Sequence, residues 1–283
     1  MALICILFGI IFERVSDTLE NLRNFDWYDR YSEWLLGSLP LDSNEQPKSA
    51  LLLMLLPLLF ITGVLQFWFA GSLLGLIELL FGIVVFAYCL GPLDINRQVD
   101  RYLVARENGD ESGARHEASL IMQQDAADDP DQQTLGVMRA VLHESNDRVF
   151  AVIFWFVLLG PLGALLYRLS SHTMRTTQQP MLSMAASQLQ AILAWAPAHL
   201  VAIGYALTGD YEGAKQEYSS KARHADLREA NYLSLITAGQ GALKDCSPGE
   251  ETACVRSARA LVLRTLVVWL AAVAILTLTG LVA

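Results

Sequence analysis

Charged residues are scarce in this sequence. Asp, Glu, Lys and Arg make up 17% of the 283 residues, whereas ordinary soluble domains carry roughly 25%. Hydrophobic residues make up 53%, and the mean hydropathy is +0.36. Acidic residues outnumber basic ones, so the formal net charge is −9. This composition argues against a soluble protein. It also argues against nucleic acid as a partner, because a phosphate backbone binds Lys-rich and Arg-rich surfaces.

The short motifs of several enzyme classes are absent as well. The sequence contains no G-x-x-x-x-G-K-[ST], H-E-x-x-H, C-x-x-C or G-x-S-x-G pattern. Nucleotide-binding P-loops, zinc proteases and serine hydrolases therefore have no support in the sequence. We expect neither a metal nor another cofactor, and a function other than catalysis is favoured.

Cysteine is rare, and its four residues fall into two pairs of different character. Cys5 and Cys89 lie in apolar runs, which is typical of buried thiols. Cys246 and Cys254 flank the turn-rich segment 247–253. They either close a small disulfide loop, which requires an oxidising compartment, or remain reduced in the cytosol. The distribution of basic residues favours the reduced state.

Long apolar runs are abundant. Four of them have about the 20 residues that one membrane crossing needs: 51–70, 72–90, 149–168 and 262–281. Runs at 2–12 and 189–208 add two further membrane segments. The first of these lacks the basic start and cleavage site of a signal peptide, so we expect it in the mature protein. The sequence thus predicts an all-α fold, a single integral membrane domain over residues 1–283 built as a multi-pass helical bundle.

The positions of Lys and Arg predict the orientation of these segments. If 189–208 crosses the membrane, most of the 20 Lys and Arg residues fall on one side. We therefore expect five crossings, with the polar regions in the cytoplasm and a short outer loop near 170–188. The polar regions are 13–49, 91–148 and 209–261.

The polar regions carry the signals of amphipathic helical hairpins. Gly109 suits a helix C-cap, and Asp110 or Ser112 suits the next N-cap, so we expect an αα-hairpin followed by a third helix over 132–146. In the region 13–49, four aromatic residues either lie at the membrane interface or pack against the other polar helices: Trp27, Tyr28, Tyr31 and Trp34.

The apolar stretch 154–168 contains Gly160-Pro161-Leu162-Gly163 near its middle and ends in Tyr167-Arg168. Proline removes a backbone donor and clashes with the carbonyl four residues earlier, so the helix should bend or break there. Broken backbone at membrane depth is tolerated only where protein or a water-filled cavity satisfies the freed groups. The break is therefore either a packing kink or one wall of a pocket, whose other wall we place at Pro197.

Four ionisable residues are further candidates for a pocket or ligand site. Glu78 stands alone in an apolar run and either pairs with a residue such as Arg168 or His199 or is a protonated, hydrogen-bonded acid. Arg168 either extends to the interface or holds an anionic ligand. His199 is either a core histidine or an acid–base group. Glu144 and Asp147 either form a polar mouth or cap neighbouring helices.

Three segments of the chain together match a known pattern. Phe154-Trp155, Gly160-Pro161, Gly163-Ala164 and Tyr167-Arg168 are similar to F-Y-x-x-x-G-G-P-x-G-A-x-x-Y-[RK]. Glu144-Ser145-Asn146-Asp147 is similar to E-N-x-x-D, and 195–200 to hydrophobic-I-P-A-R-L, with His199 in place of the arginine. On these residues the chain resembles the AmpE and CobD/CbiB-like family of bacterial inner-membrane proteins.

The resemblance implies a choice between two branches. The cobalamin branch consists of adenosylcobinamide-phosphate synthases, which join a corrinoid carboxylate to an amino alcohol using ATP and magnesium. After Arg168 those enzymes are similar to N-T-L-D-S-M, whereas residues 169–174 here contain no acid. Their R-D element before the third helix is missing too, and so are the acids before the isoleucine-proline motif. Because a magnesium–ATP site needs carboxylates, these losses favour the AmpE branch.

The AmpE branch implies regulatory signalling linked to β-lactamase induction and cell-wall turnover. A sensory or regulatory protein of the inner membrane is thus the leading hypothesis. A divergent amide-forming ligase and a carrier for a small cell-envelope metabolite are the alternatives. The expected partners are membrane lipid, a small-molecule ligand, and a signalling protein in the cytosol or the membrane.

Overall fold

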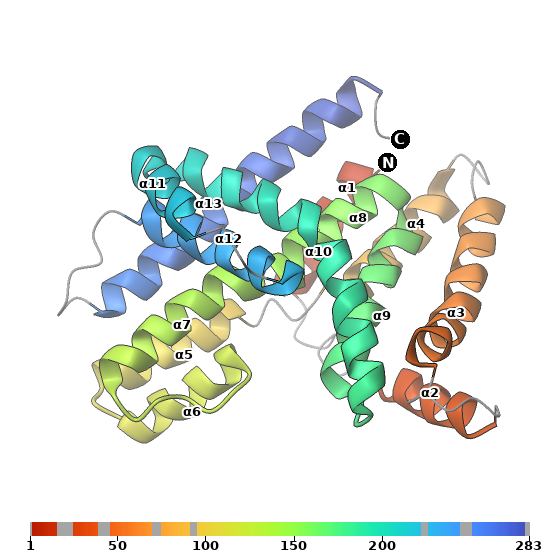
Figure 1. The fold of residues 1–283 in the computed structure, drawn as a ribbon. Helices are drawn as coiled ribbons and strands as arrows, with labels where there is room; N and C mark the ends of the chain where they lie inside the picture. The colour runs from red at the N-terminus through yellow and green to blue at the C-terminus, as the bar shows by residue number, and fades with distance from the viewer. Residues whose placement is uncertain are drawn as a thin grey trace. The chain divides into compact units, whose positions relative to one another are not determined.

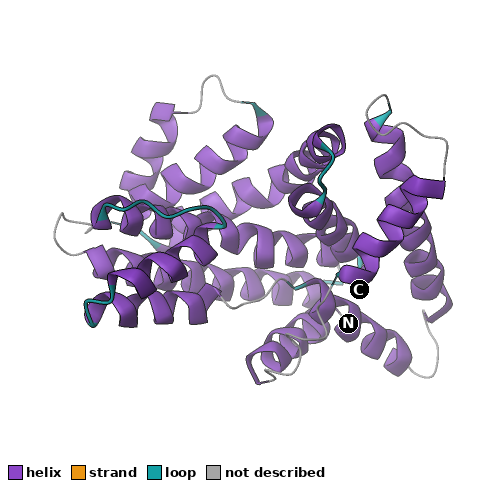
Figure 2. Ribbon diagram, turned by 90° about the horizontal axis from the view of Figure 1, so that it is seen from below, coloured by secondary structure: helices purple, strands orange, loops and turns teal. Residues whose placement is uncertain are grey.

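A computed structural model of the chain describes residues 2–15, 25–38, 46–69, 75–90, 95–221, 226–243 and 251–280. Within these ranges every regular element is helical, which confirms the predicted all-α class (Figure 2). The sequence predicted one domain. The contacts group the chain into two compact units: unit 1 holds residues 1–91, 151–194 and 273–283, and unit 2 holds 92–150 and 195–272. Each unit is described by itself.

Unit 1 contains most of the apolar helices, and Figure 1 labels them along the chain. The helices that lie in it are α1 (Ala2–Val15), α2 (Asp26–Ser38), α3 (Pro47–Phe69), α4 (Leu76–Cys89), α8 (Ala151–Leu159), α9 (Pro161–Thr176) and the first half of α10 (Pro180–Thr208).

The lengths of the apolar helices refine the expected membrane segments. Three helices are long and apolar enough to cross a membrane: Pro47–Phe69, Pro180–Thr208 and Thr252–Leu278. They contain the expected segment 189–208, residues 51–69 of the expected 51–70, and residues 262–278 of the expected 262–281. The expected span 72–90 is represented by α4, whose 14 residues reach only about 21 Å at 1.5 Å per residue. The stretch 149–168 is not one continuous helix.

Unit 1 is held together by close apolar contacts between these helices. α1 packs along α4, where a Cβ atom added to Gly9 would lie 2.4 Å from the Phe86 ring. The ring of Phe86 meets that of Phe156 from α8, with centroids 4.9 Å apart. α9 packs against α3, α4 and α8. It therefore has neighbours on several sides, and nine of its 16 residues are buried.

Unit 2 contains the polar helices together with parts of two apolar ones, α10 and α13. They are α5 (Ile95–Glu107), α6 (Glu111–Met122), α7 (Pro130–Ser145), the π-helical turn η3 (Asn146–Phe150), the second half of α10, α11 (Tyr211–Lys221), α12 (Leu227–Ala242) and most of α13 (Glu251–Leu278). Their apolar faces share one core, which includes Val99, Tyr102, Ala114, Ile121, Leu142, Tyr205, Ala214, Val255 and Leu261.

The predicted αα-hairpin is present as α5 and α6, and its caps explain it. Gly109 has a φ of 71°, the left-handed conformation that ends α5. The carboxylate of Asp110, rather than Ser112, is the N-cap of α6 and accepts a hydrogen bond from the N–H of Gly113 at 2.9 Å. This hydrogen bond lowers the pKa of Asp110. The third helix, expected over 132–146, is α7, and Asp129 caps it.

Candidate functional site

The break in the 154–168 stretch lies at Gly160. α8 ends at Leu159, and α9 begins at Pro161, which occupies the first helical position, where its missing N–H removes no helical hydrogen bond. Gly160 has φ 67° and ψ −152°, a conformation that L-residues with a side chain rarely adopt. The Gly-Pro pair therefore ends one helix and starts another.

The backbone groups freed by this break are satisfied by the side chain of Gln66, on α3. Its amide nitrogen donates to the carbonyl oxygen of Leu159 at 3.2 Å. Its amide oxygen accepts from the N–H of Leu162 at 3.2 Å. A Cβ atom at Gly160 would lie 2.7 Å from the Gln66 amide nitrogen, so glycine leaves room for this bridge. At membrane depth, the backbone groups freed by a helix break must be hydrogen-bonded by protein or by water in a cavity. Here a protein side chain binds them.

The chain folds back at the break, so that α8 and α9 lie side by side as a V (Figure 1). Gly163 is in direct contact with α8: a Cβ atom there would lie 2.3 Å from the Trp155 carbonyl oxygen. Residues eight positions apart in one straight helix would be about 12 Å apart. The two glycines of Gly-Pro-x-Gly therefore have different roles. Gly160 makes the turn, and Gly163 allows α8 and α9 to come into contact.

The other candidates of unit 1 lie at different places along these helices. Tyr167 is fully buried, and its hydroxyl accepts from the side-chain amide of Gln190 at 3.3 Å. The Arg168 guanidinium lies 5.4 Å from the centroid of the Phe25 ring, a cation–π geometry. The Phe25 ring packs at a tilt against that of Tyr88, near the C-terminal end of α4. Glu78 lies in the first turn of α4, about 15 Å away along the helix axis. The pair of Glu78 with Arg168 or His199 stays a prediction.

Pro197 leaves a backbone carbonyl without its helical hydrogen bond, and a side chain from another helix donates a hydrogen bond to that carbonyl. α10 continues through Pro197 without a break. Because proline has no N–H, the carbonyl of Leu193, four residues earlier, loses its helical hydrogen bond. The indole N–H of Trp155 donates to that carbonyl at 2.9 Å. The ring of His199 packs at a tilt against that of Trp195 with centroids 5.0 Å apart, and its Nδ1 lies 2.7 Å from the Trp195 carbonyl oxygen.

The predicted recess between the Gly160–Gly163 break and Pro197 joins residues of the two units. Gly160, Pro161, Gly163, Tyr167, Arg168 and Glu78 belong to unit 1, and Glu144, Asp147, Pro197 and His199 belong to unit 2. That recess stays a prediction. The backbone groups freed at Gly160 and at Pro197 are hydrogen-bonded by the side chains of Gln66 and Trp155.

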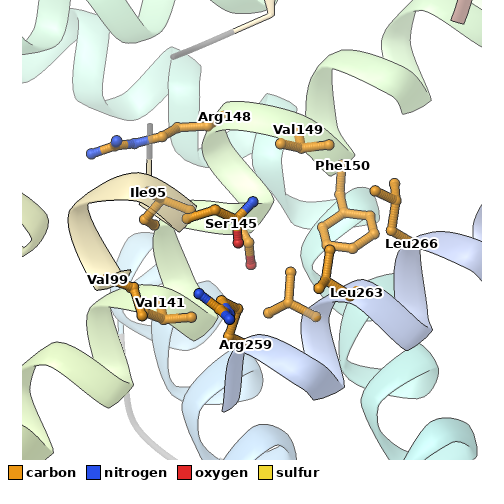
Figure 3. A pocket seen from close by; sticks show the side chains of 12 residues that line it. Ile95, Val99, Val141, Ser145, Arg148, Val149, Phe150, Arg259, Leu263 and Leu266 are labelled. Carbon is orange, nitrogen blue, oxygen red and sulfur yellow. The ribbon is translucent and has the colours of Figure 1, made fainter. Parts of the chain in front are cut away.

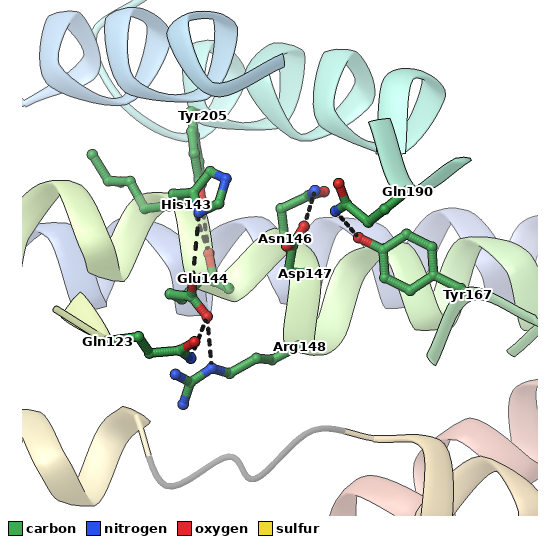
Figure 4. Close-up of polar contacts among 11 residues, drawn as sticks. Gln123, His143, Glu144, Asn146, Asp147, Arg148, Tyr167, Gln190 and Tyr205 are labelled. Atoms are coloured by element: carbon green, nitrogen blue, oxygen red, sulfur yellow. Dashed lines mark hydrogen bonds and ion pairs between the residues drawn. The ribbon is translucent and has the colours of Figure 1, made fainter. Parts of the chain in front are cut away.

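Unit 2 contains a buried ion pair beside the π-helical turn η3 (Figure 4). The Nε of Arg148 lies 3.0 Å from a carboxylate oxygen of Glu144, and the two side chains are 7% and 9% exposed. The same carboxylate accepts from the amide of Gln123 at 3.1 Å, and Nδ1 of His143 lies 3.6 Å from its other oxygen. Buried charges are tolerated only with such partners.

The π-helical turn joins α7 to α8 without interruption. Asp147 is 3% exposed and accepts from the side-chain amide of Asn146 at 3.3 Å. Both carboxylates, Glu144 and Asp147, are therefore buried. Their role as a polar mouth or as helix caps stays a prediction. Single-turn π-helices occur frequently at functional sites, so this turn is a second candidate besides the Gly160 break.

A buried tyrosine ties α10 to this turn. Tyr205 is fully buried, its hydroxyl donates to the carbonyl of Leu142 at 2.9 Å, and it lies 3.0 Å from the Ser145 hydroxyl. A small pocket of about 30 Å³ lies beside Ser145, Arg148 and Arg259 (Figure 3). That volume suits a water molecule and is too small for an organic ligand. Neither tyrosine nor pocket was singled out from the sequence.

One expectation about orientation is wrong. The region 13–49 and the loop near 170–188 were assigned to opposite sides of the membrane. In unit 1 the Tyr28 hydroxyl lies 2.8 Å from that of Thr173, and Asp29 lies 2.9 Å from Nε2 of His172. Both segments are therefore at the same end of α9. Burial lowers the pKa of His172, and the hydrogen bond with Asp29 opposes this shift.

The cysteines and the possible metal ligands are the remaining candidates. Cys5 and Cys89 are buried free thiols. Cys254 is buried near the start of α13 and is disulfide-bonded, so the favoured reduced state is wrong for this residue. Cys246 lies outside the described residues, so its pairing with Cys254 stays a prediction. Among the described residues, no group of three or more His, Cys, Asp or Glu side chains is placed to hold a metal ion.

Comparison with known proteins assigns the whole chain to one family model. Residues 1–283 match the model described as "Regulatory signalling modulator protein AmpE". The chain is also similar to two curated proteins named "Cobalamin biosynthesis protein CobD". The one from Stutzerimonas stutzeri (strain A1501) is 32% identical over 136 residues, which cover 46% of this chain and 44% of that protein.

The second relative, from Chromobacterium violaceum, is 28% identical over 179 residues, which cover 60% of this chain and 56% of the relative. The chain thus spans about half the length of the curated relatives it matches. No solved structure matches it significantly.

The bridge made by Gln66 leads to a first prediction. Gln66→Leu leaves the carbonyl of Leu159 and the N–H of Leu162 without partners, so the free energy of unfolding should fall by about 2–4 kcal/mol. Thermal unfolding of the protein in detergent measures the loss. The neighbouring change Phe67→Leu, at a side chain that is 85% exposed, should alter stability by less than about 0.5 kcal/mol. Equal stability of wild type and Gln66→Leu would contradict the bridge.

The buried ion pair leads to a second prediction. Glu144→Leu leaves Arg148 as a buried, unbalanced charge and should destabilise the protein by about 3–5 kcal/mol. The double variant Glu144→Leu/Arg148→Met removes both charges and should recover part of that loss. As a matched control, Arg101→Met breaks the pair with Glu117, in which Arg101 is 55% exposed, and should cost less than about 1 kcal/mol. Additive losses in the double variant would show that the pair is not coupled.

Proposed function

Because the chain belongs to the AmpE family of regulatory signalling modulators, we propose that it works in the bacterial inner membrane and relays a cell-envelope signal to β-lactamase expression. The observation that carries this proposal is the extent of the family match, which covers residues 1–283. The signal in question is the turnover of cell-wall material.

The described structure supports a membrane protein whose polar helices are available for contacts. Three helices are long and apolar enough to span a membrane. Unit 2 has its own core and a polar surface built from two hairpins, α5–α6 and α11–α12. Its exposed apolar side chains include Val104, Leu120 and Tyr232. We propose that this surface meets a signalling partner in the cytosol or at the membrane.

The transport hypothesis loses its main support. It rested on two proline-interrupted segments, which build substrate sites in carriers when their freed backbone groups face a cavity. Here the groups freed at Gly160 and Pro197 are bound by Gln66 and Trp155. These interruptions are occupied by protein side chains and need no transported ligand to satisfy them.

Similarity to the two CobD proteins favours one second candidate, an amide-forming ligase. The residues at the expected magnesium–ATP positions weaken it. Leu169, Ser170 and Ser171 follow Arg168 without an acid, and all three are buried. The carboxylates of Glu144 and Asp147 are engaged with Arg148 and Asn146. A phosphate-binding magnesium site needs carboxylates and cations that face the nucleotide.

Gene deletion tests the regulatory proposal. In a bacterium with an inducible β-lactamase, deletion should lower the β-lactamase activity that a sub-inhibitory β-lactam induces. Wild type and Phe67→Leu should restore induction from a plasmid. Gly160→Val should not, because a side chain there displaces Gln66 from the break. Immunoblots of membranes check that each variant is present. Induction at the parental level in the deletion strain would contradict the proposal.

Turnover of ATP tests the ligase. If the regulatory proposal is right, the purified full chain should show no magnesium-dependent ATP hydrolysis that a corrinoid together with an amino alcohol phosphate stimulates. Liquid chromatography of the nucleotides measures this reaction. Stimulated hydrolysis that Glu144→Gln abolishes would instead establish the ligase.

A further inference from the structure

A cavity of about 530 Å³ opens in unit 1. It lies between α2, the first turns of α3 and the connection from α9 to α10, and its lining includes Asp29, Met54 and Thr176. Its volume is within the range of small-molecule sites, about 300–1,000 Å³. Gly160 is at the other end of α9, about 24 Å away along the helix. The cavity is thus separate from the helix break.

The lining of this cavity carries negative charge. Asp29 and Glu33 lie one helical turn apart on α2, and both face it. No Lys or Arg side chain is among its lining residues in the described part of the chain. Asp29 is already engaged with His172 at 2.9 Å and with Thr176 at 3.2 Å. Glu33 is exposed and makes no ion pair with a described residue, so its carboxylate is available to a cation.

A further polar group on the cavity wall lacks a hydrogen-bond partner within the described structure. The side-chain oxygen of Gln179, which lines the cavity, is buried and has none. Ser32 also lines the cavity, is only 8% exposed, and its hydroxyl bonds that of Tyr28. Buried polar atoms are nearly always hydrogen-bonded, so the Gln179 oxygen indicates a ligand that brings a donor of its own.

The surroundings place this cavity near the membrane surface. Met54 and Leu182 line it, and they lie in the N-terminal halves of α3 and α10, two of the helices long enough to cross a membrane. On α2, Trp27 is 41% exposed and Trp34 is 65% exposed. Exposed tryptophans are enriched at the headgroup level of bilayers. Both a soluble molecule and a lipid headgroup can therefore reach the opening.

We propose that this cavity binds a protonated primary amine that also carries hydroxyl groups. Glu33 supplies the opposite charge, the Gln179 oxygen accepts from the ammonium group, and Ser32 bonds a ligand hydroxyl. The threonine hydroxyls on the wall offer further partners, while Leu36 and Met54 cover the carbon skeleton. A soluble amino sugar and the ammonium headgroup of a phospholipid share this chemistry. The inference does not rest on the regulatory role.

Calorimetric titration of the full chain in phosphatidylcholine nanodiscs tests the soluble source. The probes are D-glucosamine and D-glucose, which differ in that an ammonium group replaces one hydroxyl. The wild type should bind glucosamine and bind glucose at least about tenfold more weakly. Glu33→Gln should weaken glucosamine binding about tenfold, because it removes the charge and keeps the shape.

A blocking variant and a control complete this test. Gly37 lines the cavity, and a Cβ atom there would meet nothing within 4 Å. Gly37→Leu should therefore fold normally and fill part of the space, which abolishes binding. Asp125→Asn removes an exposed acid of unit 2 and should bind as the wild type does.

Native mass spectrometry tests the lipid source. If a headgroup fills the cavity, the wild type should retain phosphatidylethanolamine over phosphatidylcholine, and both Glu33→Gln and Gly37→Leu should lose this preference. Binding of glucosamine, or retention of phosphatidylethanolamine, that depends on Glu33 supports the proposal and identifies the source. Equal behaviour of wild type and Glu33→Gln in both experiments would overturn it.

Discussion

The arrangement of unit 1 depends on one side chain, Gln66, which closes the backbone at the Gly160 break. A helix that stops inside an apolar environment leaves N–H and carbonyl groups that lipid cannot bind. The Gln66 amide has one donor side and one acceptor side, and it binds Leu159 and Leu162 across the turn. This bridge allows α8 and α9 to fold against each other and fixes α9 beside α3.

The same requirement explains two other features of the chain. Pro197 frees the carbonyl of Leu193, and the indole of Trp155 binds it. Arg148 is buried beside η3, and Glu144 balances its charge. In each case a polar side chain from elsewhere in the sequence completes an interrupted helix or a buried charge. The groups freed at Gly160 and Pro197 and the charge of Arg148 are thereby satisfied within the protein. A polar group that lines a cavity without a partner lies elsewhere, in the Gln179 side chain of the cavity that Glu33 also lines.

The sequence was informative wherever structure is local. Runs of apolar residues predicted the membrane-protein class, Gly160-Pro161 predicted the break, and Gly109-Asp110 predicted a hairpin turn. The sequence did not predict contacts between residues that are far apart in the chain. Gln66 is an uncharged polar residue in an apolar run, and the cost of burying its amide was the signal that could have singled it out. Nothing in the sequence, however, pointed to Leu159 and Leu162 as its partners.

Orientation was mistaken for a related reason. The Lys and Arg count assigns each loop to one side of the membrane without using any contact between residues. Long loops follow this charge bias only weakly. The hydrogen bond between Tyr28 and Thr173 joins two segments that the count had separated. The length of α4 could not be predicted either, because apolar residues beyond a helix end look the same in sequence as those within it.

Amide hydrogen exchange at Leu162, followed by NMR on the protein in nanodiscs, tests the role of Gln66 most directly. The bridge predicts that this N–H exchanges slowly in the wild type and at least about tenfold faster in Gln66→Leu, while the N–H of Ala164, bonded to the carbonyl of Gly160, changes much less. The same slow rate for Leu162 in both proteins would contradict the account.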